Sequence, residues 1–297
     1  MEPIFFIPFF EEKPWGGDRL SKLYKKYPPG ISIGESWELS SVTYRQTFVR
    51  NGEYTGTMLS ELYKRHPEIF GTSTSYFPFV IKFIDAGRKL PLVVNGGGLK
   101  SDADQIEGNY VVQAVGPVSL VSGTNLKNNL ELFNAIENNS LDNNLEYISV
   151  SDGDSFVIPP GLPHAIQSGA LLYKIATPLL ETSNVKDCGK YSGYDLDSMA
   201  ITFRFEGHIE KFEQKEIEHG RTLIIDTERF CVEKIDSVVP VEENTDKTFV
   251  CYTSLAPGYI EKEGYKKSFR AGDTFIIPAG FGKYTLTGGL LLKAIPK

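Results

Sequence analysis

An internal repeat limits the architectures that this chain can adopt. Residues 153–175 (GDSFVIPPGLPHAIQSGALLYKI) align without gaps to residues 272–294 (GDTFIIPAGFGKYTLTGGLLLKA), and ten of the 23 aligned positions are identical. The identities include the opening Gly-Asp, the proline and glycine of the Pro-x-Gly turn, and the glycine before the final apolar run. Such self-similarity indicates that one structural unit has been built twice within the chain.

Each copy has the pattern of two strands joined by a turn. β-branched and aromatic residues precede the Pro-x-Gly turn, and leucines follow the later glycine. Further short strand patterns lie between turn signals at 223–225, 230–232 and 249–252. This spacing predicts a mostly β chain built as two sandwiches or barrels, and it disfavours an alternation of strands and helices.

Two segments depart from the β pattern. Residues 58–71 and the first part of 125–150 place apolar side chains at helical spacing, so we expect them to form helical insertions. Residues 210–221 (EKFEQKEIEHGR) form a charge run that we expect to be solvated and to mark a join. The predicted domains are therefore an N-terminal domain over 1–209 and a smaller C-terminal domain over 210–297.

Composition narrows the class of partner. The 297 residues carry 38 acidic and 31 basic side chains, a formal net charge of −7, and no cluster of basic residues typical of nucleic-acid binding. No apolar run approaches the roughly 20 residues that a membrane-spanning helix needs. The apolar start of the chain lacks the basic residues of a signal peptide. We therefore expect a cytoplasmic monomer or homodimer that binds a small molecule, with no nucleic-acid or membrane partner.

The first copy of the repeat also carries a recognisable motif. The spacing G-x5-P-x-G-x2-H, from Gly153 to His164, resembles the second conserved motif of cupins. Together with PWGG, GESW, NGEYTGTMLSELYKRHPEIFG and FPFVIKFIDAG, it makes nearly the whole chain similar to class I mannose-6-phosphate isomerases. The resemblance implies a double cupin with helical insertions. It also implies a zinc-dependent interconversion of aldose and ketose phosphates through an enediol.

The resemblance places the metal site on specific residues. In the family's metal-binding motif the first residue and the His fall on Val93 and Asn95. The Glu ligand falls near Asn109, with Glu107 two residues away on the same face of a strand. The fourth ligand falls on His164, which is the one ligand that is clearly kept. Asn95 and Asn109 suit sugar hydroxyls better than zinc, because amides both donate and accept hydrogen bonds.

The acid/base positions are also substituted. The family's acid/base Glu falls on Lys174, and Glu181 is a candidate to replace it. Lys82 and Lys190 are candidates for binding the substrate. Two interpretations of Lys174 stay open: it could point into the barrel and bind phosphate or act as a base, or it could be a strand-end surface residue, because Lys293 holds the same position in the second copy.

Two functional hypotheses follow. One is the family's isomerase, with zinc held by His164 and replacement donors. The other is a non-catalytic sugar or sugar-phosphate binder, a pseudoenzyme that kept the barrel and lost the metal. A carboxylate near His164, such as Glu107 or Glu181, supports the enzyme. A pocket lined only by amides, glycines and Lys174 supports the binder.

Overall fold

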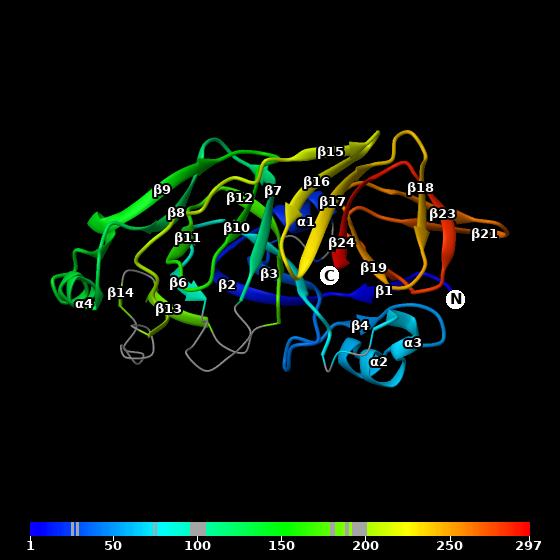
Figure 1. Ribbon diagram of the computed structural model, residues 1–297, viewed down its shortest axis with the longest axis horizontal. Coiled ribbons are helices and arrows are strands. Elements are labelled where there is room, and N and C mark those ends of the chain that lie inside the picture. The colour runs from blue at the N-terminus through cyan, green and yellow to red at the C-terminus, as the bar shows by residue number, and fades with distance from the viewer. Residues whose placement is uncertain are drawn as a thin grey trace.

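The computed structural model describes residues 1–24, 27, 30–72, 74, 76–95, 105–178, 182–187, 190–191 and 201–297. Its strands form four antiparallel sheets that are arranged as two barrels side by side (Figure 1). The green and cyan strands belong mainly to the first barrel, and the yellow to red strands to the second. The prediction of a mostly β double cupin with helical insertions is confirmed.

The first barrel is made of two six-stranded sheets. In spatial order, the first sheet contains β10 (Ser155–Ile158), β7 (Glu107–Ala114), β12 (Ala170–Ala176), β5 (Val80–Asp85), β3 (Ile33–Leu39) and β2 (Phe9–Gly17). The second sheet contains β14 (Lys190–Tyr191), β13 (Thr182–Asp187), β6 (Leu92–Asn95), β11 (His164–Ile166), β8 (Val118–Thr124) and β9 (Leu145–Val150).

The second barrel is made of an eight-stranded and a four-stranded sheet. The larger contains β15 (Lys215–Glu218), β16 (Arg221–Asp226), β17 (Phe230–Asp236), β24 (Leu290–Pro296), β19 (Val250–Ser254), β22 (Thr274–Ile277), β1 (Ile4–Ile7) and β4 (Phe48–Val49). The smaller contains β18 (Val241–Thr245), β23 (Gly282–Thr287), β20 (Gly258–Lys262) and β21 (Tyr265–Phe269).

The repeat lies at matching places in the two barrels. β10 and β12 both pair with β7, just as β22 and β24 both pair with β19. The second barrel also takes two strands from early in the chain, since β1 pairs with β22 and β4 pairs with β1. The division of the chain at residues 209 and 210 stays a prediction.

The helical insertions begin and end close to where apolar spacing predicts them. α2 (Leu59–Arg65) and α3 (Pro67–Phe70) lie beside the second barrel, where the Phe70 ring contacts Phe249 with centroids 5.2 Å apart. α4 (Asn129–Glu137) and η1 (Leu141–Asn144) lie at the far end of the first barrel (Figure 1). Asn128 caps α4 by accepting a hydrogen bond from the Glu131 amide. A short helix, α1 (Arg19–Tyr24), follows β2.

One apolar core joins the two barrels. It contains side chains from the first barrel, such as Phe79 and Tyr173, and side chains from the second, such as Ile225 and Phe230. All four residues of β15, within the predicted charge run, are exposed, as expected of a solvated segment. None of the described helices combines enough length with enough apolar character to cross a membrane.

Candidate active site in the first barrel

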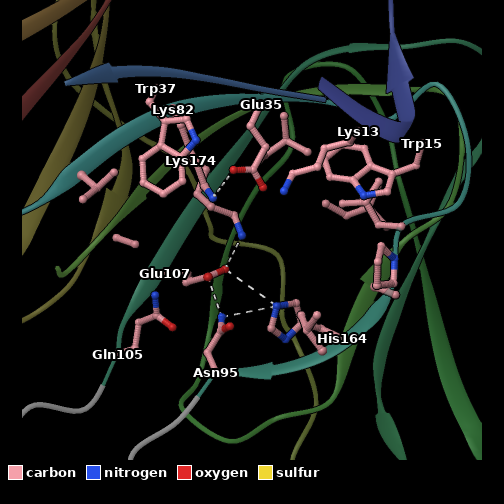
Figure 2. A pocket seen from close by; sticks show the side chains of 18 of the residues that line it. Lys13, Trp15, Glu35, Trp37, Lys82, Asn95, Gln105, Glu107, His164 and Lys174 are labelled. Carbon is pink, nitrogen blue, oxygen red and sulfur yellow. Dashed lines mark hydrogen bonds and ion pairs between the residues drawn. The ribbon is translucent and has the colours of Figure 1, made fainter. Parts of the chain in front are cut away.

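A cavity of about 630 Å³ lies in the first barrel, with walls from both of its sheets (Figure 2). Side chains two positions apart on a strand share a face, which is why Glu35 and Trp37 of β3 both reach it. The strand register extends this polar wall. Trp37 lies opposite Lys82, and Lys82 lies opposite Lys174 on the next strand. β7 supplies Glu107 from the same sheet.

Four side chains from four strands meet at one end of the cavity. The Lys174 ammonium donates to Glu107 Oε2 at 2.7 Å, and the Asn95 amide nitrogen donates to Glu107 Oε1. His164 Nε2 lies 3.8 Å from Glu107 Oε2 and 3.4 Å from the Asn95 amide nitrogen. Figure 2 shows the four polar groups pointing toward one another. We call Asn95, Glu107, His164 and Lys174 the Glu107 cluster.

His164 has a fixed orientation within this cluster. Its Nδ1 lies 2.8 Å from the carbonyl oxygen of Leu162, which can only accept a hydrogen bond. Nδ1 therefore carries the proton, and the Nε2 lone pair faces Asn95 and Glu107. Burial lowers the pKa of His164 below its ordinary value, because the charged imidazolium loses its water. The ring is neutral at physiological pH.

Glu107 is 4% exposed and carries a negative charge. Burial alone raises the pKa of a carboxyl group, but the neighbouring positive charges, led by that of Lys174, hold the pKa of Glu107 below its ordinary value. The buried end of the cavity thus contains a carboxylate, an ammonium group and a neutral imidazole. These groups can accept protons, donate hydrogen bonds and polarise an oxygen atom of a bound molecule.

A second ion pair lies along the wall. Lys82 Nζ lies 3.2 Å from Glu35 Oε2 and 4.3 Å from the centre of the Trp37 ring. Burial lowers the pKa of Lys82, and the charge of Lys174 acts in the same direction. Toward the side formed by β2, Arg45 also faces the Trp37 ring, with its guanidinium carbon 5.1 Å from the ring centre.

The cavity brings together some of the predicted site residues. Asn95, His164, Lys82 and Lys174 all line it. The surface interpretation of Lys174 is wrong, because its side chain is mostly buried and bonded to Glu107. A carboxylate does lie near His164, and it is Glu107.

Three other predicted site residues, Asn109, Glu181 and Lys190, are not placed at the cavity by the described residues. Asn109 is fully buried on β7 directly opposite Lys174, does not line the cavity, and has no hydrogen-bond partner for its amide among the described residues. Glu181 lies outside the described residues. Lys190 is described only as part of the backbone of β14. The roles of these residues stay predictions.

Several lining residues carry no motif that predicts them as site residues. Lys13 comes from β2, Glu35 from β3, Arg45 from the segment after β3, and Gln105 from the segment before β7. Lys13 directly precedes PWGG and Glu35 lies in GESW, two of the segments that carry the resemblance. The alternation within GESW puts Glu35 and Trp37 on one face. Arg45 and Gln105 have no such signal, because only the folded chain brings them to the cavity.

Comparison with known proteins identifies the family. The chain is 28% identical to a mannose-6-phosphate isomerase of Bacillus subtilis, covering 97% of this chain and 96% of that one. It is 34% identical to a mannose-6-phosphate isomerase of Streptococcus mutans over 202 residues, which cover 66% of this chain and 61% of that one. A crystal structure of the Bacillus subtilis mannose 6-phosphate isomerase superimposes with a TM-score of 0.90, at 25% identity over 99% of both chains. The chain belongs to the mannose-6-phosphate isomerase family.

No family model matches the chain. A zinc-bound mannose 6-phosphate isomerase structure superimposes with a TM-score of 0.79 over the whole of both chains, at 11% identity, which is a likeness of fold. Zinc is therefore the metal whose fit to the Glu107 cluster matters here.

The Glu107 cluster does not fit a zinc ion. Zinc needs several oxygen, nitrogen or sulfur donors that converge on one point with free lone pairs. Each carboxylate oxygen of Glu107 accepts a hydrogen bond, one from Lys174 and one from Asn95, so a metal ion would compete with an ammonium group and an amide for the same carboxylate. The Asn95 amide must turn its nitrogen toward Glu107, because its oxygen would repel the carboxylate. Among the residues that the structure describes, no group of three or more His, Cys, Asp and Glu side chains could hold a metal.

Proposed function

We propose that this protein is a sugar-phosphate isomerase that interconverts an aldose and a ketose, with mannose 6-phosphate and fructose 6-phosphate as the substrate pair. The names of its relatives support this substrate class. The observation that carries the proposal is the Glu107 cluster, in which a carboxylate lies between an ammonium group and a neutral imidazole inside a ligand-sized cavity. This substrate class belongs to cytoplasmic carbohydrate metabolism.

The charge of the cavity supports a phosphorylated ligand. Its lining includes four cationic side chains against two carboxylates, although the chain as a whole has a net charge of −7. The four cationic residues are Lys13, Arg45, Lys82 and Lys174. Glu11, which does not line the cavity, pairs with Lys13 and Arg45, and the four cationic groups still outnumber the three carboxylates. A concave site with a net positive charge concentrates anionic ligands. The site therefore favours an anionic sugar over a neutral one.

The proposed reaction moves one proton between neighbouring carbons. Glu107 takes the proton from C2 of the open-chain aldose, and the electrons of the broken C–H bond form the enediol double bond. Lys174 donates a hydrogen bond to the C1 oxygen, which stabilises the negative charge that develops there. His164 Nε2 accepts the proton of the C2 hydroxyl group and delivers it to the C1 oxygen, so that the C2 oxygen becomes the carbonyl oxygen and the imidazole returns to its neutral form. Return of the first proton to C1 then yields the ketose.

The test is turnover of mannose 6-phosphate by the purified protein, followed as formation of fructose 6-phosphate. We expect turnover in the native protein and a loss of about 100-fold or more in Glu107→Gln, which removes a general base and keeps its shape. Glu243→Gln, in the second barrel, is the matched control and should keep its turnover. A folded native protein with no turnover of any aldose phosphate would contradict the proposal.

A second candidate function is sugar-phosphate binding without turnover. The observation that favours it is that Glu107 accepts two strong hydrogen bonds, which make the carboxylate a weaker base. A binder would show a rise in melting temperature with mannose 6-phosphate, weakened by His164→Ala, and no product. Product formation that Glu107→Gln abolishes decides for the enzyme.

A further inference from the structure

We propose that Lys174 is a built-in cation: its ammonium group takes the place beside Glu107 and His164 that a divalent metal would need, so that the cavity works without one. The proposal deepens the proposed function, since the ligand that it considers is the same sugar phosphate. It rests on the contacts of the Glu107 cluster and on the internal repeat.

The first support is charge balance. A buried carboxylate without a partner is costly, and a single ammonium group at hydrogen-bond distance supplies the compensation. Lys174 Nζ lies 2.7 Å from Glu107 Oε2, and both side chains are mostly buried. Lys82, on the neighbouring strand, adds a second positive charge whose field reaches Glu107. A divalent cation placed between Glu107 and His164 would be repelled by two ammonium groups.

The second support is the direction of the hydrogen bonds. Asn95 donates one amide hydrogen to Glu107 and points its nitrogen at His164 Nε2, 3.4 Å away. The strongest metal donors would be the Glu107 carboxylate and His164 Nε2. Both already face N–H groups. A metal would have to displace Lys174 and also turn Asn95 into an orientation that its neighbours oppose.

The third support is that the chain has built the same kind of pair twice. Lys293 holds the position of Lys174 in the second copy of the repeat. It is also buried, and its ammonium lies 2.8 Å from Glu243. Lys283, at the position that matches His164, is exposed. In the second barrel, where Lys283 replaces the histidine, Lys293 thus neutralises a buried glutamate without any metal-binding imidazole nearby in the repeat. Lys174 can neutralise Glu107 in the same way.

The experiment is zinc binding by the full chain after removal of metals by EDTA and dialysis. Bound zinc is measured by mass spectrometry of metal content and by titration with zinc chloride, in the native protein and in His164→Ala. We expect both proteins to bind the same small amount of zinc. The melting-temperature shift caused by mannose 6-phosphate should be the same with and without EDTA.

Variants that remove the ammonium group beside Glu107 test the role of Lys174 directly. Lys174→Met frees one oxygen of Glu107, and we expect zinc affinity to rise about tenfold or more, the scale on which groups around a metal's ligands alter its binding. Adding Asn95→His should raise it further by supplying an imidazole. Lys293→Met is the matched control and should not bind more zinc than the native protein. If Lys174→Met fails to fold, the native and His164→Ala measurements still decide.

One result would overturn the proposal: a native protein that binds one equivalent of zinc and loses it in His164→Ala. Failure of the proposed function has a different signature. If mannose 6-phosphate neither binds nor turns over, with or without zinc, the substrate assignment fails. Even then, zinc binding that rises in Lys174→Met and not in Lys293→Met would support the role of Lys174 as a cation.

Discussion

The two barrels share a repeat but differ in what fills their interiors. In the first, the matching strands surround a cavity that His164 and Lys174 line. In the second, the Tyr252 and Phe275 rings stack with centroids 5.3 Å apart, and the Tyr252 and Tyr284 hydroxyls are 2.8 Å apart. Aromatic side chains therefore form part of the packed core of the second barrel. The same backbone unit serves as a site in one copy and as a packed support in the other.

The buried lysines show the difference most directly. Lys174 faces the cavity, and one nearby carboxylate, Glu107, accepts its hydrogen bond. Lys293 lies between Glu243 and Glu233, at 2.8 and 3.5 Å, and Glu243 is also 2.8 Å from Arg221. The second network links its charged side chains to one another, which is typical of a structural role, whereas Lys174 and Glu107 line a cavity and can exchange partners with a ligand.

The largest expected effect separates the two glutamates. Glu107→Gln should lower turnover of mannose 6-phosphate by about 100-fold or more, because the base is lost. Glu243→Gln should leave turnover nearly unchanged and lower stability, because Lys293 and Arg221 lose a charged partner. Steady-state kinetics and urea denaturation of both variants measure the contrast. Equal losses of turnover would break the comparison.

Removal of the two lysines tests the same contrast through stability. Lys293→Met should lower the free energy of unfolding by about 3 kcal/mol, because the buried Glu243 loses one of its two cationic partners and the partly buried Glu233 loses its contact with the ammonium group. Lys174→Met should cost less, about 1–2 kcal/mol, because water in the cavity can solvate Glu107. Urea midpoints and slopes of the two variants give the difference. A larger loss in Lys174→Met would contradict this order.

The fold was largely predictable from sequence, because the repeat, the turn glycines and the helical spacing are local patterns. The candidate site was predictable only in part. Alternation on a strand places Glu107 on the same face as Asn109, so the sequence alone could not choose between them. The choice depends on the register between β7 and β12, which puts Asn109 under Lys174 and leaves Glu107 at the cavity. Pairing between distant strands is not encoded in either strand alone.

The Pro-x-Gly turns provide a third comparison. Gly161 and Gly280 hold the same place in the two copies and have φ values of 73° and 70°, where a side chain costs about 1–2 kcal/mol. A Cβ on Gly161 would lie 2.2 Å from the carbonyl oxygen of Thr202, whereas on Gly280 the nearest atom is 3.9 Å away. Gly161→Ala should therefore destabilise the protein more than Gly280→Ala, measured as melting temperatures. Equal shifts would show that the Thr202 segment moves freely.

The smallest expected effect concerns the edge strands β2 and β15, which hold matching places in their sheets. Hydrogen bonds from Arg45, together with Lys13, outweigh burial and lower the pKa of Glu11 on β2 to about 2. Because the folded pKa lies below the unfolded one, this stabilisation is complete above about pH 4.5 and is lost as the pH falls through about 2. Glu218 on β15 is mostly exposed beside Arg221.

Glu11→Gln should lower the free energy of unfolding by about 1–2 kcal/mol at pH 7, and it should flatten the decline of stability between pH 4.5 and 2. Glu218→Gln should cost no more than about 0.5 kcal/mol, as expected of an exposed pair. Denaturation at a series of pH values measures both variants. An unchanged acid limb in Glu11→Gln would assign the loss of stability at low pH to other carboxylates.

Strand β1 makes closure of the second barrel depend on two segments that lie far apart in the sequence. Its residues Ile4 and Phe5 pair with Ile276 and Phe275, and the Phe5 and Phe275 rings contact each other with centroids 4.8 Å apart. On its other side β1 pairs with β4, which lies much nearer in the sequence. Contacts between segments as distant as β1 and β22 form slowly. The edge made by β1 and β4 can therefore form early, whereas closure of the second barrel has to wait until that edge meets β22.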